Sequence, residues 1–233
     1  MFGMSIQPSP ARSERRRNTL SLDVVLTEAV AILDEHGERG LTFRRLTEGL
    51  GTGPGGVYWY VQDKADLINL ACDRVVANAL DAVPEQPGEE PMAVLRGLAL
   101  AVFDELDRHP WAGPHLTSNP GQQNTLRLLD RFGRLVTEAG LPADQQFYAA
   151  SAVLNYVVGV GTQMARALSR VVGDTDREDY LAAAVARWEE LDEQEFAFVR
   201  RVAGTVREHD DREQFTAGLD LLLVGIGRAG GRA

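Results

Sequence analysis

The residues best suited to a chemical role form an aromatic cluster that is followed by a lysine. Tyr58, Trp59 and Tyr60 are consecutive, and Lys64 comes four residues after the last of them. Consecutive side chains on one helix point in different directions, so the three rings cannot all enter one core. Simple packing in the interior is one explanation for such a cluster. The tyrosine hydroxyls and the lysine are also suited to phosphate and base edges, which predicts an interface with duplex DNA.

Three short helices are predicted around this cluster and would position it. Their predicted ranges are 22–37, 42–50 and 54–60. Ser21 is a suitable cap for the first helix, and Pro54 suits the first turn of the third. Val57 and Val61 are one turn apart and would face the interior. This pattern is typical of a helix-turn-helix, in which one helix enters a major groove roughly 12 Å wide while its partners support it.

The rest of the chain also has the apolar periodicity of helices. A fourth helix is predicted from Asp63 to 82, and the Pro- and Gly-rich segment 83–91 predicts a domain boundary. Further helices are predicted over about 92–108, 122–139, 143–170, 177–206 and 213–228. No alternating strand pattern longer than a few residues occurs. The predicted fold is therefore all-α, with an N-terminal helix-turn-helix DNA-binding domain and a larger helical domain.

Composition and charge restrict the class of protein. The chain has 233 residues, is 44% hydrophobic and carries a net charge of −10. Residues 1–66 hold 8 basic and 9 acidic side chains, so most of the negative charge lies in the C-terminal part. This distribution does not fit a general nucleic-acid coat protein, although it permits a local contact with phosphate. No apolar run has the roughly 18 residues of a membrane span, and the N-terminus lacks an apolar export segment.

Catalysis and metal binding are not expected. The four histidines, His36, His109, His115 and His209, are scattered, and neither HExxH nor CxxC spacing occurs. The single cysteine, Cys72, lies in the middle of a predicted helix and cannot form an internal disulfide. The sequence therefore predicts a non-enzymatic, cytoplasmic protein without catalytic residues, cofactors, metal sites or a membrane partner.

The helix-turn-helix segment resembles the tetracycline-repressor (TetR) family over about residues 21–80. The resemblance rests on Leu41-Thr42-Phe43-Arg44-Arg45-Leu46, on Leu50-Gly51 and on Val57-Tyr58-Trp59-Tyr60-Val61-Gln62-Asp63-Lys64-Ala65-Asp66-Leu67. It implies that Arg44 can reach a guanine edge and that Tyr58 and Lys64 hold phosphates. The predicted DNA-binding residues are Thr42, Arg44, Thr52, Gly53, Pro54, Gly55, Tyr58, Tyr60 and Lys64.

The first turn of the third helix departs from the family pattern. Family members usually carry polar residues such as Gln or Thr there, whereas this chain has Gly53, Pro54, Gly55 and Gly56. Each glycine inside a helix costs roughly 1 kcal/mol relative to alanine. Glycine also supplies no side chain to read a base. We therefore expect sequence specificity to depend on Arg44, Thr52, Tyr58 and the shape of the DNA.

Two C-terminal helices, about 143–170 and 213–228, are apolar nearly all round. Such a helix must be covered on two sides, by its own core and by another body. Glycines such as Gly159 and Gly225 would allow a second helix to approach closely. A thick monomeric core is one solution. The resemblance favours the other, a homodimer formed through these two helices, with its two heads about 34–36 Å apart.

The resemblance also implies an effector site in the larger domain. The segment from Pro114 to Pro120 and the helix that begins near Phe147 are similar to parts of the tetracycline-repressor body. The family glutamate that completes a metal relay falls on Gln163, and an amide is a poor Mg²⁺ ligand. We therefore expect a largely apolar effector instead of a metal-bound one. The predicted ligand-binding residues are Trp111, His115, Asn119, Phe132, Asn155, Gln163 and Met164.

The predicted organisation has four parts. They are a flexible basic arm at 1–18, a helix-turn-helix domain at 19–66, a ligand-binding and dimerisation domain at 67–228 and a flexible tail at 229–233. The arm carries four arginines, which either keep the chain soluble or contact DNA. The predicted function is a homodimeric repressor that binds a palindromic DNA operator and is released by a small-molecule effector. The alternative is a helical dimeric sensor or interaction protein with weak or lost DNA binding.

Overall fold

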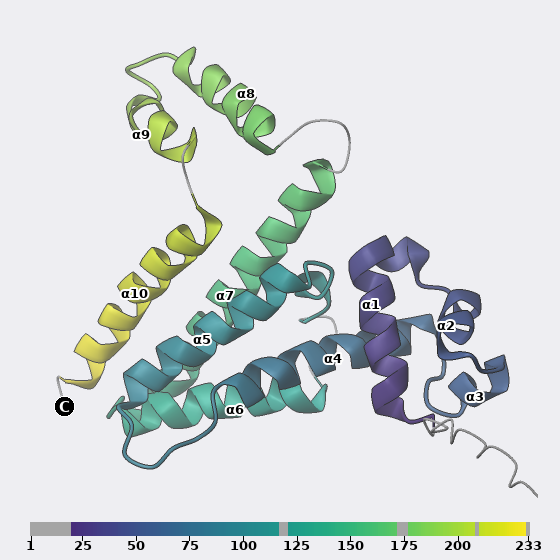
Figure 1. The fold of residues 1–233 in the computed structure, drawn as a ribbon. Helices are drawn as coiled ribbons and strands as arrows, with labels where there is room; N and C mark the ends of the chain where they lie inside the picture. The colour runs from purple at the N-terminus through teal and green to yellow at the C-terminus, as the bar shows by residue number, and fades with distance from the viewer. Residues whose placement is uncertain (1–19, 117–120, 172–176, 208–209, 232–233) are drawn as a thin grey trace, which may run out of the picture.

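The computed structural model describes residues 20–116, 121–171, 177–207 and 210–231, and within these ranges it contains helices and no strands (Figure 1). The all-α prediction is therefore confirmed. The elements are α1 (Leu22–Gly40), α2 (Phe43–Leu50), α3 (Pro54–Tyr58), α4 (Lys64–Ala82), α5 (Pro91–Arg108), the short 3-10 helix η1 (Gly113–His115), α6 (Gln123–Glu138), α7 (Ala143–Val171), α8 (Arg177–Glu189), α9 (Ala197–Arg207) and α10 (Asp211–Gly230).

Most helix ends lie within a few residues of the predicted ones, but the single helix predicted over 177–206 is wrong. It is divided into α8 and α9 by a turn at Asp192, whose Oδ1 accepts hydrogen bonds from the backbone N–H groups of Gln194 and Glu195 at 3.0 and 2.9 Å. Aspartate competes well for backbone groups in this way, and the helix is interrupted there. Apolar periodicity alone does not detect such a turn.

Helix α4 belongs to two separate clusters of buried side chains. Its first half contributes Leu67, Ile68 and Ala71 to a cluster shared with α1, α2 and α3, which we call the head. Its second half contributes Cys72 and residues up to Ala79 to a larger cluster shared with α5, α6, α7 and α10, which we call the body. Head and body are therefore joined by one continuous helix.

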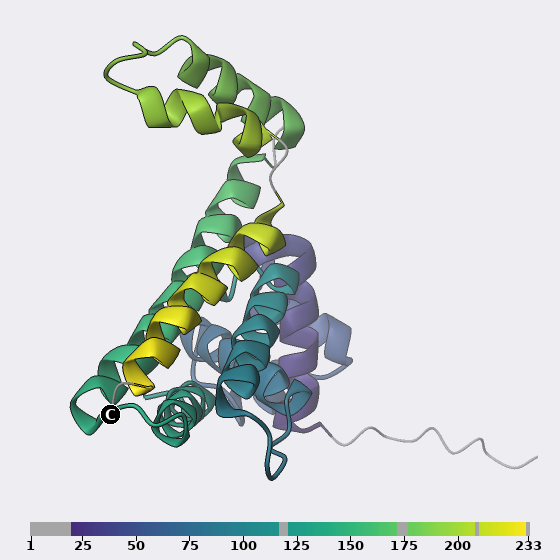
Figure 2. The same ribbon diagram turned by 90° about the vertical axis from the view of Figure 1, so that its left-hand side faces the viewer.

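The helices of the body lie around α5 and α7. Helices α7 and α10 run side by side along one side of the body in both views (Figures 1 and 2). Helices α8 and α9 pair with each other and project beyond the end of this bundle (Figure 2). None of the described helices has both the length and the apolar composition that crossing a bilayer requires.

Candidate DNA-binding and effector sites

The turn between α2 and α3 has the geometry of a helix-turn-helix. Thr42 caps α2 because its Oγ1 accepts a hydrogen bond from the backbone N–H of Arg45 at 3.2 Å. Gly51 then reverses the chain in the left-handed region (φ 59°), which glycine adopts without strain. The N–H of Thr52 donates to the carbonyl of Thr47 at 3.1 Å and closes the turn. Helix α3 therefore starts at a fixed angle to α2.

The aromatic cluster lies at the end of α3, and two of its rings face outward. Val57 and Val61 are buried, as predicted, and they fix the helix against the head. Tyr58 is exposed, and its ring stacks on that of Phe43 with 4.6 Å between the centroids. Trp59 is 85% exposed, and the sequence-based list of DNA-binding residues missed it. An exposed tryptophan next to the predicted phosphate-binding tyrosine belongs to the same candidate interface.

Arg44 is positioned on α2 with its side chain in solvent. It is 88% exposed, and its Nε donates to Oε1 of Glu48 at 2.9 Å. This exposed pair, one helical turn apart, contributes little to stability and can exchange for a contact with DNA. The side chain is thus placed where the predicted contact requires it, and its role in reading a base stays a prediction.

Two other predicted DNA-binding residues bind other parts of the head in this structure. The hydroxyl of Tyr60 donates to the carbonyl of Leu20 at 2.6 Å, and Nζ of Lys64 donates to the carbonyl of Glu38 at 2.5 Å. The first bond attaches the segment after α3 to the residue Leu20, just before α1, and the second attaches it to α1 itself. Lys64 has three N–H donors, so one internal bond leaves donors for a phosphate.

The glycine-rich start of α3 is open. Gly53 and the first residue of α3, Pro54, are exposed, and no side chain caps the helix. A Cβ atom added at Gly53 or Gly55 would meet nothing within 4 Å. The backbone here is accessible to a partner, and the dependence of base reading on neighbouring side chains stays a prediction.

The predicted ligand-binding residues lie in three different places. Phe132 is fully buried in the core of the body, whereas Asn155 and Gln163 are exposed on α7. Trp111 and His115 are partly buried next to the head. Asn119 lies outside the described residues, as does the side chain of Met164. Trp111 precedes η1 and His115 ends it. Helix η1 packs on α7 at Gly161 and Thr162, next to Gln163. Binding of an effector by these residues stays a prediction.

Trp111 and His115 connect the body to the head. Nε1 of Trp111 donates to Oδ1 of Asp34 at 2.7 Å, and a ring nitrogen of His115 lies 2.9 Å from Oε1 of Glu38. His109, at the end of α5, also contacts Asp34, with 2.8 Å between Nδ1 and Oδ1. Because Asp34 and Glu38 belong to α1, these polar contacts position the head relative to the segment around η1.

Neither a metal site nor a reactive thiol occurs within the described residues. No group of three or more His, Cys, Asp or Glu side chains is arranged there to hold a metal ion. Cys72 is buried, and its burial, together with the nearby charge of Asp73, raises its pKa to about 12. A thiol with such a pKa stays protonated and is a poor nucleophile.

The outer faces of α7 and α10 expose large apolar side chains. Phe147 and Tyr148 are exposed near the start of α7, and Leu221, which is 77% exposed, lies with Val224 on α10. A Cβ atom added at Gly225 would meet nothing within 4 Å. Several exposed large apolar side chains on two packed helices are typical of an interface with another protein chain.

Comparison with known proteins agrees with this geometry. Residues 83–229 match the family model described as tetracyclin repressor-like, C-terminal domain. The HTH-type transcriptional repressor DrrR1 of Streptomyces coeruleorubidus is 30% identical over 175 residues, which are 70% of this chain. The matched part spans less than two thirds, 62%, of that relative's length.

Solved structures show the same fold over nearly the whole chain. The transcriptional regulator SCO7222 of Streptomyces coelicolor, a TetR, is 38% identical with a TM-score of 0.78, and the match covers 91% of this chain and 100% of that one. ActR of Streptomyces coelicolor, solved in complex with actinorhodin, is 20% identical with a TM-score of 0.76, and the match covers 92% of this chain and 99% of that one. The family model covers more than half of the residues, so the chain belongs to the tetracycline-repressor (TetR) family of transcriptional regulators.

Proposed function

We propose that the protein is a homodimeric transcriptional repressor that binds a palindromic DNA operator and releases it when a small, largely apolar effector binds to the body. Membership of the TetR family supports regulation of transcription. The observation that carries the proposal is the distribution of side chains at α3. Val57 is buried and holds the helix against the head, whereas Tyr58 and Trp59 are exposed to solvent.

The exposed residues of the head suit a protein–DNA interface. Arg44 projects from α2, and Tyr58 and Trp59 project from the end of α3. We propose that Arg44 contacts a base edge and that Tyr58, Thr42 and Lys64 contact phosphates on either side of the groove. Stacking on Phe43 restricts the ring of Tyr58 before DNA arrives, which lowers the entropy lost on binding.

The exposed apolar faces of α7 and α10 support dimerisation. In a two-fold dimer each face would pack on its copy, and Leu221 and Phe147 would leave water. Burying such side chains contributes about 1.5–3 kcal/mol each. The same symmetry would place the two heads in successive major grooves, which requires a palindromic operator.

The contacts between the body and α1 provide a route for the effector. The segment around Trp111 and His115 is hydrogen-bonded to Asp34 and Glu38 of α1. An effector that binds beside this segment and changes these bonds would alter the positions of the two heads. The free energy of DNA binding would then weaken by the difference in effector-binding free energy between the arrangement of heads that fits DNA and the one that the effector favours. The complex of ActR with actinorhodin shows that this fold can hold an organic ligand.

A helical dimeric sensor with weak DNA binding is the second candidate. It is favoured by the charge of the head, because residues 20–66 hold 4 basic and 8 acidic side chains. A negatively charged head is repelled by phosphate. For the repressor, the arginines of the predicted arm at 1–18, which lies outside the described residues, would have to supply the missing attraction to DNA.

Operator binding by the full-length protein distinguishes the two candidates. Fluorescence anisotropy would be measured with duplexes from the intergenic region beside the gene and with shuffled duplexes of the same composition. We expect specific binding that is tighter than binding to shuffled DNA by about a thousandfold or more and that weakens as salt rises. Equal, weak binding to both duplexes would support the sensor. Analytical ultracentrifugation should give a dimer, and Leu221→Glu should give a folded monomer.

A further inference from the structure

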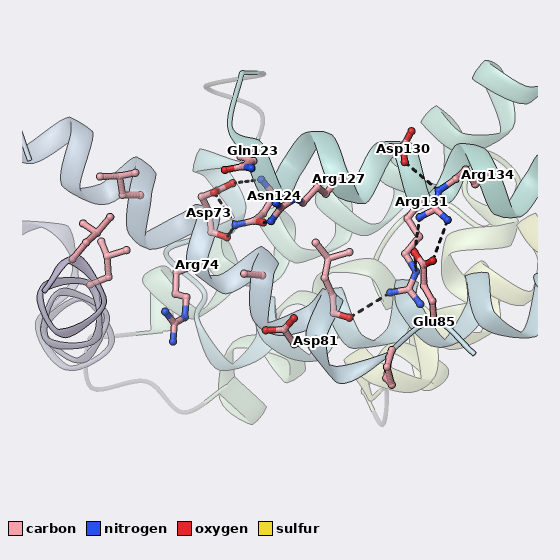
Figure 3. Close-up of a pocket in the computed structure, with 16 residues that line it drawn as sticks. Asp73, Arg74, Asp81, Glu85, Gln123, Asn124, Arg127, Asp130, Arg131 and Arg134 are labelled. Atoms are coloured by element: carbon pink, nitrogen blue, oxygen red, sulfur yellow. Dashed lines mark hydrogen bonds and ion pairs between the residues drawn. The ribbon is translucent and has the colours of Figure 1, made fainter. Parts of the chain in front are cut away.

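A charged groove runs between head and body, on the side formed by α1, α4 and α6 (Figure 3). Its volume is about 800 Å³, which is large enough for a metabolite. Leu22, Leu26 and Leu70 line the end next to the head, and Glu85, Arg131 and Arg134 line the other end. None of the residues predicted to bind the effector lines this groove. It is therefore a different cavity from the site proposed above.

Arg131 is the unusual residue of this groove. Its side chain is only 6% exposed, and one guanidinium nitrogen, Nη1, donates to the carbonyl of Leu80 at 3.3 Å. The other two nitrogens, Nε and Nη2, are buried and have no hydrogen-bond partner in the structure. A buried guanidinium with unmade hydrogen bonds is costly, because the lost hydration is not replaced.

The nearest carboxylate is held away from Arg131 by a second arginine. Oε1 of Glu85 lies 3.7 Å from Nε of Arg131, which is beyond hydrogen-bonding distance. Both oxygens of Glu85 instead accept hydrogen bonds from Arg134, at 2.5 and 3.2 Å (Figure 3). Nε and Nη2 form one edge of the guanidinium, and this edge matches the two oxygens of a carboxylate. This edge of Arg131, a fork of N–H donors, therefore has the geometry to bind a carboxylate.

The other arginines of the groove have partners of two kinds, carboxylates for Arg74 and Arg134 and a neutral amide for Arg127. Arg74 forms an ion pair with Asp23 of α1, Arg134 binds Glu85 and Asp130, and Arg127 donates to the side-chain oxygen of Asn124. Asp73 accepts hydrogen bonds from the first backbone N–H groups of α6. The lining holds four arginines and four acidic side chains, Asp81 among them, so it suits a ligand with one negative charge better than a phosphate or a dianion.

We propose that this groove is a second ligand site, which binds an organic monocarboxylate with an apolar chain. The carboxylate accepts both free N–H groups of Arg131 after the exposed Glu85 side chain turns aside. The apolar chain packs against Ala77, Leu80 and Pro84 and points toward the end lined by Leu22, Leu26 and Leu70. The groove is lined by α1 of the head as well as by α6 of the body, so a ligand long enough to reach Leu70 contacts both.

Octanoate is the probe that tests the proposal. Binding to the full-length protein would be measured without DNA by isothermal titration calorimetry, with uncharged octanamide as the comparison. We expect octanoate to bind about tenfold or more tightly than octanamide, because only the carboxylate satisfies Arg131. Absence of octanoate binding, or equal binding of the two compounds, would overturn the proposal. Since no DNA is present, the result does not depend on whether the protein is a repressor.

Two substitutions locate the site. Glu85→Gln removes the competing charge on an exposed side chain and should tighten octanoate binding severalfold. Arg131→Met keeps the apolar stem, removes the fork and should abolish the preference for octanoate over octanamide. If Arg131→Met does not fold, the Nε–H resonance of Arg131 in the wild-type protein provides the same information, since it must shift on octanoate addition and not on octanamide addition. Unchanged affinity in Glu85→Gln together with an unshifted resonance would place octanoate elsewhere and refute the site.

Discussion

Replacement of Arg44 by alanine separates the stability of the head from its contact with DNA. Arg44 is 88% exposed and is paired with Glu48 one helical turn away. Exposed pairs of this kind contribute little, so the variant should keep nearly all of the unfolding free energy of the wild type. For a chain of this length the melting temperature should fall by only about 1–2 °C.

The effect on the operator should be much larger. A base contact by arginine contributes about 1–3 kcal/mol, and a dimer makes the contact twice. Arg44→Ala should therefore weaken operator binding by about 2 kcal/mol or more, which is about thirtyfold. Affinity for shuffled DNA should change little, because that complex depends on phosphate contacts.

Two further variants complete the test by anisotropy titration. Glu48→Gln removes the carboxylate that holds Arg44 and also repels phosphate, so it should tighten binding. Arg187→Ala removes an exposed arginine of α8, far from the head, and serves as the matched control. If Arg44→Ala binds the operator as tightly as Arg187→Ala does, the assignment of Arg44 is wrong. A proportional loss on operator and shuffled DNA would make Arg44 a phosphate contact instead.

Other residues give predictions that depend on burial and charge. Trp59 is exposed, so Trp59→Ala should weaken operator binding in the anisotropy titration without lowering the melting temperature. Val57 is buried, so Val57→Ala should lower the unfolding free energy measured by urea titration by about 1–3 kcal/mol relative to the wild type. Leu221→Glu should give a folded monomer by sedimentation, and a dimer would contradict the proposed interface. Hydrogen bonds from Arg96 lower the pKa of Asp220 in the folded protein. The pair therefore stabilises the fold at any pH above the pKa that Asp220 has in the unfolded chain. This stabilisation is lost as the pH falls through the lower pKa of Asp220 in the folded protein. In urea titrations between about pH 6 and pH 2.5, the wild type should lose slightly more unfolding free energy than Asp220→Asn. An identical pH dependence of the two proteins would refute the contribution of this pair.

Local sequence patterns predicted most of the helices because they depend on nearby residues. The spacing of Val57 and Val61 predicted which face of α3 is buried, and Gly51 and Pro54 predicted the turn before it. These features follow from helix geometry and backbone preferences, which act over a few residues.

Features that depend on distant partners were not predictable in the same way. Asn155 was predicted to bind the effector, and it is exposed on α7 in the single chain. Lys64 binds a carbonyl 26 residues earlier, and Trp111 binds Asp34 across 77 residues. Sequence periodicity contains no information about such pairs, since the first forms only when the helices of the head pack together and the second only when the head packs on the body.

The sharing of α4 between two cores affects how the chain can be divided for engineering. A hybrid regulator made by joining this head to a foreign body cannot be cut after α3, because the head would lose Leu67, Ile68 and Ala71. The least disruptive junction falls inside α4, between Ala71 and Cys72, and the foreign helix must continue there without a change of register. A shift by one residue would rotate the grafted body by about 100° around the helix axis and move both heads away from a common operator.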